Sequence, residues 1–381
     1  MRDKGKRLLH VVNVAFVLPY FIGDQIAFLR NKGFYQAIVA SYSEELIRYG
    51  GKHDVPIFPI SITRSFSVLK DIKSVNLLVR LIKKEKFNIV IGHTPKGALL
   101  SMIAAYITKV PQRVYFRHGI MYETSKGLKR ILLKNIERLT ARLATKVVCV
   151  SPSVMEVSKK DRLSKSTKNI LLNRGTCNGI DLNRFTPSNA IDQELLRQKL
   201  DINVKDFVVG YVGRLVRDKG IVELVKSWQL LIARFPNVRL LLVGPFEERD
   251  ALPEEIKDYI LNEPSVIFTG LVEDTVPYYK IMDMFILPSY REGFPTVVLE
   301  ASAMEVPVLT TRVTGCVDSI VEGESGEYIE CSPQAICERI MELGMDREKL
   351  RRYGAFGRKW VKENFDQKVI WDRIYEEVLR S

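Results

Sequence analysis

The chain has 381 residues, of which 46% are apolar and 27% are charged, a composition typical of a soluble globular protein with two domains of ordinary size. It has no uninterrupted run of apolar residues long enough to span a membrane. The longest candidate, residues 8–22, is broken by His10, Asn13 and Pro19, which also argues against a signal peptide. Residues 1–190 contain 33 Lys and Arg against 12 Asp and Glu, a net charge of +21, whereas the remainder carries −8. We therefore expect the basic half to meet an anionic partner: a membrane surface, a nucleic acid or a phosphorylated acceptor.

In the first half of the chain, short β-branched and apolar runs alternate with helical stretches. Two of these stretches, residues 69–85 and 96–108, have the length and composition of helices. Apolar strands separated by helices are typical of a parallel sheet that is covered on both faces. The predicted strands are residues 8–17, 36–40, 57–60, 89–92, 113–116 and 146–150.

The same alternation restarts after Asp206 and predicts a second doubly wound domain. Its predicted strands are residues 207–211, 240–243, 266–268, 284–287 and 306–310. The junction is expected near residues 187–191, after a turn-rich stretch at 178–181. Residues 365–379 are amphipathic and are expected to pack back on the first domain as a closing helix. The predicted domains are therefore 1–187 and 188–364, followed by the closing helix at 365–381.

A glycine-rich turn with two cations follows the first strand of the second domain. Arg214 and Lys219 precede an apolar helix, and cations at a helix N-terminus suit a diphosphate. A tight turn with two solvated cations is the structural alternative. Neither Gly-Lys-Ser/Thr nor Gly-x-Gly-x-x-Gly occurs there, which disfavours a Walker loop and a dinucleotide site.

Two carboxylates lie eight positions apart around a Gly-Phe-Pro turn. Glu292 precedes the turn and Glu300 lies inside the apolar run behind it. Proline favours the first turn of a helix, so residues 296–304 are predicted to be helical after Pro295. A carboxylate in apolar surroundings costs free energy unless a polar group meets it, and a sugar or ribose that offers two hydroxyls is one such partner.

Several motifs of the second half occur together in one order and spacing. They are residues 210–214 with Lys219-Gly220, then Asp283, residues 288–295, Glu300-Ala301 and Pro307. In this combination the chain resembles retaining glycosyltransferases of family 4, which have the GT-B fold. The first half resembles the bacterial polysaccharide branch of that family more loosely, through His93-Thr94-Pro95-Lys96 and Arg117-His118-Gly119. The resemblance implies two doubly wound Rossmann-like domains that face a cleft, with a C-terminal helix that crosses back to the first domain.

The resemblance also implies roles for individual residues. Arg214 and Lys219 match the pair that grips the donor diphosphate, and Glu300 matches the acid that holds the ribose hydroxyls. Glu292 matches the acid that reaches the donor sugar, and His118 a histidine that faces that sugar. His118, Glu292, Arg214 and Lys219 are thus the expected catalytic residues. Other donor-binding positions are Gly293, Phe294, Pro295 and Thr296, with Leu271 and Val272 near the base.

A lone histidine at a strand end is more often structural than catalytic, and His10, His53 and His93 are interpreted in that way. His93 is in addition a weaker candidate for the acceptor side. Residues 18–24 stand where the family often has a Gly-Gly loop, and their aromatic side chains suggest an unusual acceptor pocket.

No metal site and no cofactor are expected. The four histidines and five cysteines are dispersed, and Asp-x-Asp and Cys-x-x-Cys spacings are absent. Arg214, Lys219 and the helix after Pro295 can stabilise the negative charge of a departing phosphate without a metal. The scattered cysteines predict a reduced, cytoplasmic setting.

A row of cations recurs at every fourth residue of a further predicted helix. The plain explanation is a surface helix with a solvated basic face. The sharper explanation is a contact with anionic lipid headgroups or with a lipid-diphosphate acceptor, which the net charge of this half favours. The row consists of Lys126, Arg130, Lys134 and Arg138, continued by Arg142 and Lys146, beside an apolar row at 128, 132, 136, 139 and 143.

Together these features predict a retaining, metal-independent glycosyltransferase of surface-polysaccharide biosynthesis. The expected donor is UDP-linked, with an N-acetylhexosamine as one candidate sugar, and the expected acceptor is a polyprenyl-diphosphate-linked sugar at the cytoplasmic face of the membrane. No nucleic acid is expected. One alternative is a nucleotide-sugar 2-epimerase of the same fold, against which the Glu292 and Glu300 pair argues. The other is a non-catalytic basic protein that binds membranes or nucleic acid.

Overall fold

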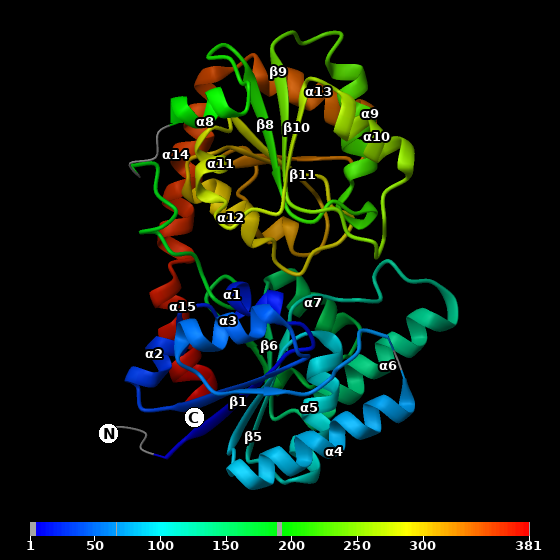
Figure 1. Cartoon of the computed structure of the whole chain (residues 1–381), viewed down its shortest axis with the longest axis vertical. Coiled ribbons are helices and arrows are strands. Elements are labelled where there is room, and N and C mark those ends of the chain that lie inside the picture. The colour runs from blue at the N-terminus through cyan, green and yellow to red at the C-terminus, as the bar shows by residue number, and fades with distance from the viewer. Residues whose placement is uncertain (1–4, 66, 189–192, 381) are drawn as a thin grey trace. The chain divides into compact units, whose positions relative to one another are not determined.

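The computed structural model describes residues 5–65, 67–188 and 193–380. The chain divides into two compact units, Met1–Gly179 with Gln367–Ser381 and Ile180–Asp366. The boundary between the two units, after Gly179, therefore precedes the boundary predicted at residue 187. The junction predicted at residues 187–191 falls largely outside the described residues. Figure 1 shows the course of the chain through both units.

Unit 1 is built on a seven-stranded parallel sheet with the order β3-β2-β1-β4-β5-β6-β7. The order reverses between β1 and β4, which are neighbours although two strands separate them in the sequence. The strands are β1 (Arg7–Val11), β2 (Tyr35–Ala40), β3 (Ile57–Pro59), β4 (Ile89–Gly92), β5 (Gln112–Arg117), β6 (Lys146–Cys149) and β7 (Asn169–Leu171).

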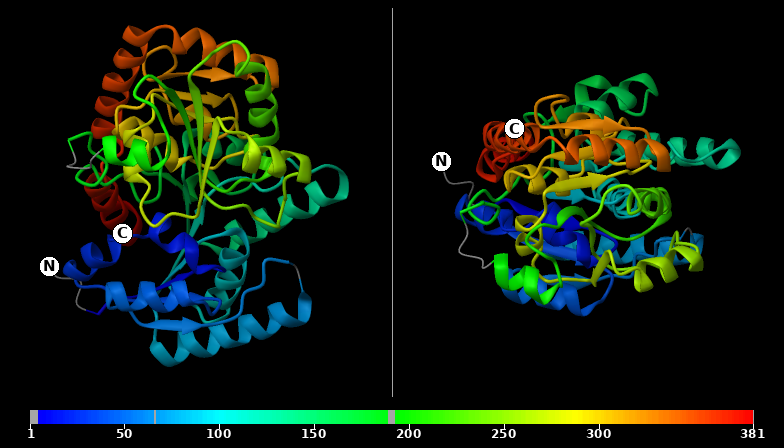
Figure 2. Two further views of the ribbon diagram at one scale, coloured as in Figure 1. Left: turned by 45° about the horizontal axis from the view of Figure 1, so that its top comes forward. Right: turned by 90° about the horizontal axis from the view of Figure 1, so that it is seen from above.

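Helices cover both faces of this sheet (Figures 1 and 2). Among them, α5 contacts both α4 and α6, so these three helices form one layer. The helices of unit 1 are α1 (Leu18–Phe21), α2 (Gln25–Asn31), α3 (Glu44–His53), α4 (Val68–Glu85), α5 (Pro95–Ile107), α6 (Gly127–Leu143) and α7 (Pro152–Lys160), with short 3-10 turns at Ala15–Val17 and Ser166–Lys168.

The C-terminal segment packs on unit 1. It consists of α15 (Gln367–Arg373) and a π-helical turn (Ile374–Leu379), rather than one helix from residue 365. Trp371 Nε1 donates a hydrogen bond to Asn178 Oδ1 at 2.8 Å, and Lys6 Nζ donates to the carbonyl of Leu379 at 3.1 Å. These contacts join the end of the chain to the residue before the first strand and to the last residues before unit 2.

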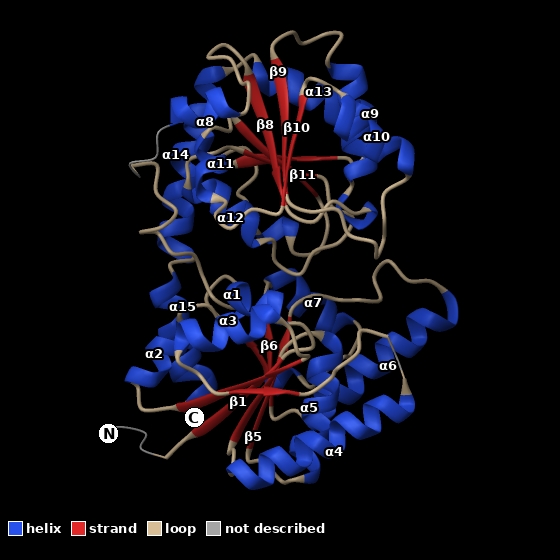
Figure 3. Cartoon of the chain, in the orientation of Figure 1, coloured by secondary structure: helices blue, strands red, loops and turns tan. Residues whose placement is uncertain are grey.

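Unit 2 contains a six-stranded parallel sheet with the order β10-β9-β8-β11-β12-β13, which reverses between β8 and β11. Figure 3 shows its strands enclosed by helices. The strands are β8 (Phe207–Val212), β9 (Val238–Val243), β10 (Val266–Gly270), β11 (Met284–Leu287), β12 (Val308–Thr311) and β13 (Gly326–Ile329). The helices are α8 (Gln193–Lys199), α9 (Ile221–Leu231), α10 (Glu254–Asn262), α11 (Val276–Lys280), α12 (Thr296–Ala303), α13 (Pro333–Gly344) and α14 (Arg347–Asn364), with 3-10 turns at Arg217–Lys219 and Cys316–Asp318.

The strand predicted at residues 8–17 is wrong in its second half. β1 ends at Val11, and the chain then forms the 3-10 turn and α1, with Pro19 in the first turn of that helix. Proline fixes φ near the helical value and has no N–H to lose, so it suits this position. The short strands β7 and β13 were not predicted, because β7 is only half-buried and β13 has half-buried central residues, so neither has the apolar pattern of the central strands.

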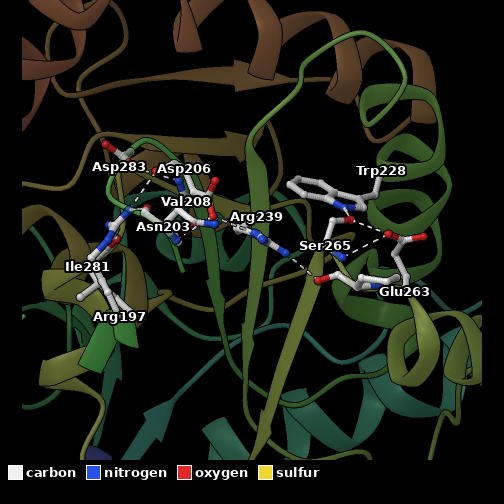
Figure 4. A network of polar contacts seen from close by, with 11 residues as sticks. Arg197, Asn203, Asp206, Val208, Trp228, Arg239, Glu263, Ser265, Ile281 and Asp283 are labelled. Atoms are coloured by element: carbon white, nitrogen blue, oxygen red, sulfur yellow. Dashed lines mark hydrogen bonds and ion pairs between the residues drawn. The ribbon is translucent and has the colours of Figure 1, made fainter. Parts of the chain in front are cut away.

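Carboxylates anchor the amino edge of the unit 2 sheet (Figure 4). Asp283, directly before β11, accepts a hydrogen bond from the backbone N–H of Val208 at 2.8 Å. Asp206, directly before β8, forms an ion pair with Arg239 at 2.9 Å. Asp283 is thus a structural residue at the edge of the sheet opposite to the site described next.

Candidate active site

The predicted donor-binding residues gather where the strand order of unit 2 reverses. Arg214 and Lys219 lie in the loop that follows β8, and Glu292 lies in the loop that follows β11. Because β8 and β11 are parallel neighbours, both loops leave the sheet at its carboxyl edge. In open α/β sheets this reversal point is the usual place for a ligand.

Two glycines allow the loops at this edge to pack backbone against backbone. Gly220 has a φ of +70°, and a Cβ there would collide with the carbonyl of Pro288. Gly315 has a φ of +82°, and a Cβ there would collide with the carbonyl of Gly293. A side chain at either position would therefore push apart the loops that carry Lys219 and Glu292.

Lys219 and Glu292 form an ion pair between the ammonium group and Oε1. The hydroxyl of Ser289 donates to the same carboxylate oxygen at 2.9 Å. Both charged side chains are mostly buried, with 19% and 12% of their surface exposed. The sequence assigned these two residues to one ligand, and the structure brings them into direct contact.

Arg214 is paired with a residue that the sequence did not single out. Its guanidinium contacts Oε2 of Glu247, in the segment that follows β9. The side chain of Arg214 is 44% exposed, more than that of Glu247. The position of Glu247 shortly after a buried strand was the available signal, since that strand also ends at the carboxyl edge.

Glu300 lies in the second turn of α12 and is buried. The hydroxyl of Tyr279, itself fully buried, donates to Glu300 Oε2 at 2.9 Å. Burial raises the pKa of Glu300, while this hydrogen bond and the charge of Arg184 lower it. Oε1 of Glu300 is not among the buried unpaired atoms of the described residues, so that oxygen is open to a ligand. Tyr279 was not predicted because nothing in its local sequence points toward α12.

The remaining predicted donor positions lie on the same edge. Leu271 follows β10 and is 81% exposed, whereas the next residue, Val272, packs on the core. Phe294 packs against Phe365, with ring centroids 5.4 Å apart. Pro295 is the N-cap of α12, and Thr296 is its first helical residue. No side chain caps this helix, and although the N–H of Val298 bonds to the carbonyl of Pro295, those of Thr296 and Val297 remain available.

In unit 1, three histidines form a line. His10 Nδ1 lies 3.3 Å from His93 Nε2, and His93 Nδ1 lies 3.1 Å from His118 Nε2. The ring of Phe21 stacks on His118 with centroids 3.7 Å apart, so the aromatic segment at 18–24 does reach this histidine. The predicted residues His93 and His118 are thus in contact, and His10, interpreted as structural, belongs to the same cluster.

Burial keeps these imidazoles neutral. It lowers the pKa of His10 to about 4 and that of His118 to about 3. Burial also lowers the pKa of His93 well below its ordinary value. The residue after His93 supports a functional role for this corner, because Thr94 has a φ of +59°. A β-branched residue rarely adopts such a conformation, and strain of this kind is concentrated at functional sites.

The predicted row of cations lies on α6, but it is shorter than expected. Lys126 is the exposed N-cap of this helix, and the guanidinium of Arg130 lies over the ring of Tyr122. Lys134 pairs with Asp161 at 2.7 Å, and Arg138 donates to the backbone carbonyl of the same residue at 3.0 Å.

The continuation of the row to residue 146 is wrong, because α6 ends at Leu143. Lys146 lies in β6 and donates to the backbone carbonyl of Val378 at 2.9 Å. A four-residue spacing alone therefore does not show that cations share one helix.

Two further observations concern metals and membranes. Within the part of the chain that the structure describes, no group of three or more His, Cys, Asp or Glu side chains could hold a metal ion. Independence from metals stays a prediction. None of the described helices has both the length and the hydropathy required to cross a bilayer.

Comparison with known proteins identifies the family. The Glycosyl transferases group 1 family matches residues 192–360, and the Glycosyltransferase Family 4 matches residues 21–172. The capsular polysaccharide biosynthesis glycosyltransferase CapM of Staphylococcus aureus is 36% identical over 374 residues, which cover 97% of this chain and 96% of that protein. The chain is a family 4 glycosyltransferase. This assignment favours a transferase over the epimerase and over a non-catalytic binding protein.

Two other proteins similar to this glycosyltransferase are informative. The UDP-Gal:alpha-D-GlcNAc-diphosphoundecaprenol alpha-1,3-galactosyltransferase of Escherichia coli is 28% identical over 296 residues, covering 77% of this chain and 75% of that protein. The structure of Anabaena Alr3699/HepE in complex with UDP and glucose matches with a TM-score of 0.82 and 20% identity, over 99% of this chain and 100% of that one. At this identity the likeness concerns the fold alone, and it confirms the predicted GT-B fold.

Proposed function

We propose that this glycosyltransferase retains the configuration of the sugar that it moves from a UDP-linked donor to a polyprenyl-diphosphate-linked sugar. The observation that carries the proposal is the ion pair of Lys219 with Glu292, which joins the loops that leave β8 and β11, with Arg214 on the first of these loops. The name of the Escherichia coli relative, which gives a UDP donor and a diphosphoundecaprenol acceptor, supports this substrate class. Synthesis of a surface polysaccharide is the corresponding role, which the name of CapM also supports.

The donor would lie along the carboxyl edge of the unit 2 sheet. The open oxygen of Glu300 is suited to the ribose hydroxyls, and the exposed Leu271 with Val272 is suited to the base. Arg214 and Lys219 would take the diphosphate. Glu292 and the N–H groups of Gly293 and Phe294 would then meet the sugar.

The chemistry that these residues supply is electrostatic. Transfer of the sugar leaves negative charge on the departing phosphate, and fixed cations and helix N–H groups stabilise such charge most strongly where water is excluded. Because Glu292 would bind hydroxyls, we favour attack of the acceptor on the face that the phosphate leaves, through an oxocarbenium-like state, over a covalent sugar intermediate. Two cations supply the charge that a metal would otherwise provide, so we propose that the reaction needs none.

Calorimetry with a panel of UDP- and GDP-sugars tests the donor assignment. Binding of a UDP-sugar, with the same sugar on GDP bound more weakly, is the expected result. If no nucleotide sugar bound, the proposed function would be wrong.

Replacing His118 with alanine is expected to lower kcat by about 10²-fold, a loss within the range for one positioned polar group at a reacting centre. UDP affinity should stay unchanged, because the residues proposed to hold UDP all lie in unit 2. Steady-state kinetics and calorimetry separate the two effects. His53→Ala is the matched control, since His53 pairs with Asp24 away from the histidine line. An unchanged kcat in His118→Ala would assign His118 a structural role.

We further propose that α6 lies on the cytoplasmic face of the membrane. Its buried face includes Leu133, Glu137 and Ala141. At 100° per residue, the opposite face carries an apolar stripe that is exposed to solvent, with cations on both flanks. This pattern is typical of a helix in the plane of a membrane interface. The stripe consists of Leu128, Ile131, Leu132 and Leu139, the flanking cations are Lys129 and Arg138, and Arg142 lies on the same face as the stripe.

A basic cavity beside α6 supports the same orientation. It has a volume of about 700 Å³ and lies between the C-terminal half of α6 and the segment that follows α7. Four of the cations that line it have no acidic partner among the described residues. Each cation close to an anionic surface adds about 1 kcal/mol to binding. These cations are Arg142, Lys159, Arg162 and Lys165.

Replacing Leu128, Ile131 and Leu132 together with serine is expected to weaken binding to phosphatidylglycerol vesicles by about tenfold or more, because burial of an apolar side chain is worth about 1.5–3 kcal/mol. Co-sedimentation measures the effect. Leu261→Ser, at an exposed leucine of α10, is the control and should bind as the unaltered protein does. Binding should also weaken as salt rises, since the screening length falls from about 10 Å at 0.1 M to about 3 Å at 1 M. Equal binding to neutral and anionic vesicles would refute the electrostatic part of the proposal.

A further inference from the structure

The loops after β8 and β11 each carry two consecutive residues of opposite charge, and each of these residues meets its opposite on the other loop. The first loop carries Asp218 and Lys219, and the second carries Arg291 and Glu292. The ion pair of Lys219 with Glu292 belongs to the candidate donor site. The second ion pair joins Arg291 Nη2 to Asp218 Oδ2 at 2.8 Å, with 28% and 29% of these side chains exposed.

Backbone contacts reinforce the second ion pair. The N–H of Tyr290, directly before Arg291, donates to the carbonyl of Asp218 at 3.0 Å. On its other side, Asp218 donates its own N–H to Oδ2 of Asp250 at 2.7 Å. Asp250 lies in the segment between β9 and α10, and the strand order is β9-β8-β11. Asp218 is therefore held by the loops on both sides of its own.

The two ion pairs differ in what the proposed reaction asks of them. The donor diphosphate would take Lys219 and the donor sugar would take Glu292, so these two side chains give up their direct contact. Asp218 and Arg291 have no such task. Arg291 Nη2 is already bound to a carboxylate, and its Nε is buried, so a ligand does not reach that atom. The second ion pair can therefore persist while the first one opens.

We propose that Asp218 and Arg291 are positioning residues that hold the loops after β8 and β11 together while Lys219 and Glu292 separate to admit the nucleotide sugar. The ligand in this statement rests on the proposed function, whereas the contact between the loops does not. Loops that are already joined lose little freedom on binding, so the pair increases the affinity for a ligand that bridges them.

This arrangement favours the complete donor over its product. A nucleotide sugar would contact Lys219 on one loop and Glu292 on the other, so it benefits from loops that are held together. UDP alone would contact Lys219 but has no sugar to offer to Glu292. The pair of Asp218 with Arg291 therefore strengthens binding of the nucleotide sugar without strengthening binding of UDP.

Asp218→Ala and Arg291→Met each remove one charge and leave the backbone contacts in place. Either change is expected to weaken nucleotide-sugar binding and to raise its KM by about two- to fivefold, the range for a partly exposed ion pair. kcat should change less than KM, because the bound donor itself bridges the loops, and UDP affinity should stay unchanged. Calorimetry and steady-state kinetics measure these quantities.

A double-mutant cycle shows whether the two residues act through each other. The double variant should bind the nucleotide sugar no more weakly than either single variant, because only one interaction is lost. Arg291→Lys keeps the charge and should restore most of the affinity. Arg339→Gln is the matched control, since Arg339 pairs with Glu327 at 2.8 Å between α13 and β13 and is 37% exposed. Additive losses, an unchanged KM in both single variants, or an equal loss of UDP affinity would overturn the proposal.

Amide hydrogen exchange in the absence of nucleotide tests the contact between the loops by itself. The N–H of Tyr290 is bonded to the first loop, so it should exchange faster in Arg291→Met than in the unaltered protein. Its exchange should not change in Arg339→Gln. Unchanged exchange in Arg291→Met would overturn the role of the pair. If the exchange changed as expected but no nucleotide sugar bound to any of these proteins, the proposed function would fail while the joined loops stood.

Discussion

Replacing Lys219 with alanine is expected to lower kcat by about 10²–10³-fold, the loss typical of removing one group that stabilises developing charge. Lys219 lies directly on Glu292 and is 19% exposed, so its charge acts in a site from which water is largely excluded. In the proposed reaction that charge compensates the phosphate as it departs. The variant also leaves the carboxylate of Glu292 without its cation. Steady-state kinetics with the donor found by calorimetry measure the effect.

Lys257→Ala is the matched control for this prediction. Lys257 forms an ion pair with Glu254 at 2.7 Å on the surface of α10, and exposed pairs contribute only about 0–1 kcal/mol. Its kcat should equal that of the unaltered enzyme. A Lys219→Ala enzyme that was equally active, with its melting temperature unchanged, would contradict any role of Lys219 in the reaction.

Replacing Glu300 with alanine is expected to weaken UDP binding by about 10- to 100-fold, because hydrogen bonds to a charged group are worth about 1.5–3 kcal/mol and 1.4 kcal/mol corresponds to a factor of ten. Alanine also leaves the buried hydroxyl of Tyr279 without its acceptor. Glu300→Gln keeps an oxygen for Tyr279, so it separates loss of the ligand contact from loss of internal packing. Calorimetry with UDP should give an intermediate affinity for this variant. Equal affinities in all three proteins would remove Glu300 from the donor site.

Glu300 should also make UDP binding dependent on pH. Burial raises the pKa of this carboxyl, which the Tyr279 hydrogen bond only partly offsets. As the pH falls, Glu300 therefore takes up its proton earlier than an ordinary glutamate does and loses an acceptor for the ribose. Affinity should decline on acidification in the unaltered enzyme, and Glu300→Gln should flatten that part of the profile. Glu254→Gln, at an exposed glutamate, should leave the profile as it is.

The fold could be predicted from the sequence because its central strands are short, apolar and β-branched. The strands at 89–92 and 284–287 agree with the structure to the residue. Segments whose secondary structure depends on packing against neighbouring elements were harder to predict. Residues 12–17 are as apolar as β1, and only the packing of unit 1 and Pro19 turn them into a 3-10 turn and a helix.

The candidate site was predicted through its charged residues but not through their partners. Arg214, Lys219, Glu292 and Glu300 do lie at one edge of one sheet. Their contacts join residues 21 to 73 positions apart, such as Glu300 with Tyr279 and Lys219 with Glu292. A sequence pattern records which side chains are charged, whereas the pairing depends on how the loops of several strands meet. The contacts between the three histidines were missed for the same reason, since one strand and the segments that follow two others supply them.

The two ion pairs of the site give the enzyme its own internal counter-ions. Glu247 neutralises Arg214 and Glu292 neutralises Lys219, so in the proposed donor complex a diphosphate would displace carboxylates rather than fill two bare positive charges. That exchange would lower the net affinity for phosphate groups, and after the proposed transfer the same carboxylates would return to the cations and help to expel UDP. We therefore expect an enzyme that gives up tightness of binding in return for faster turnover.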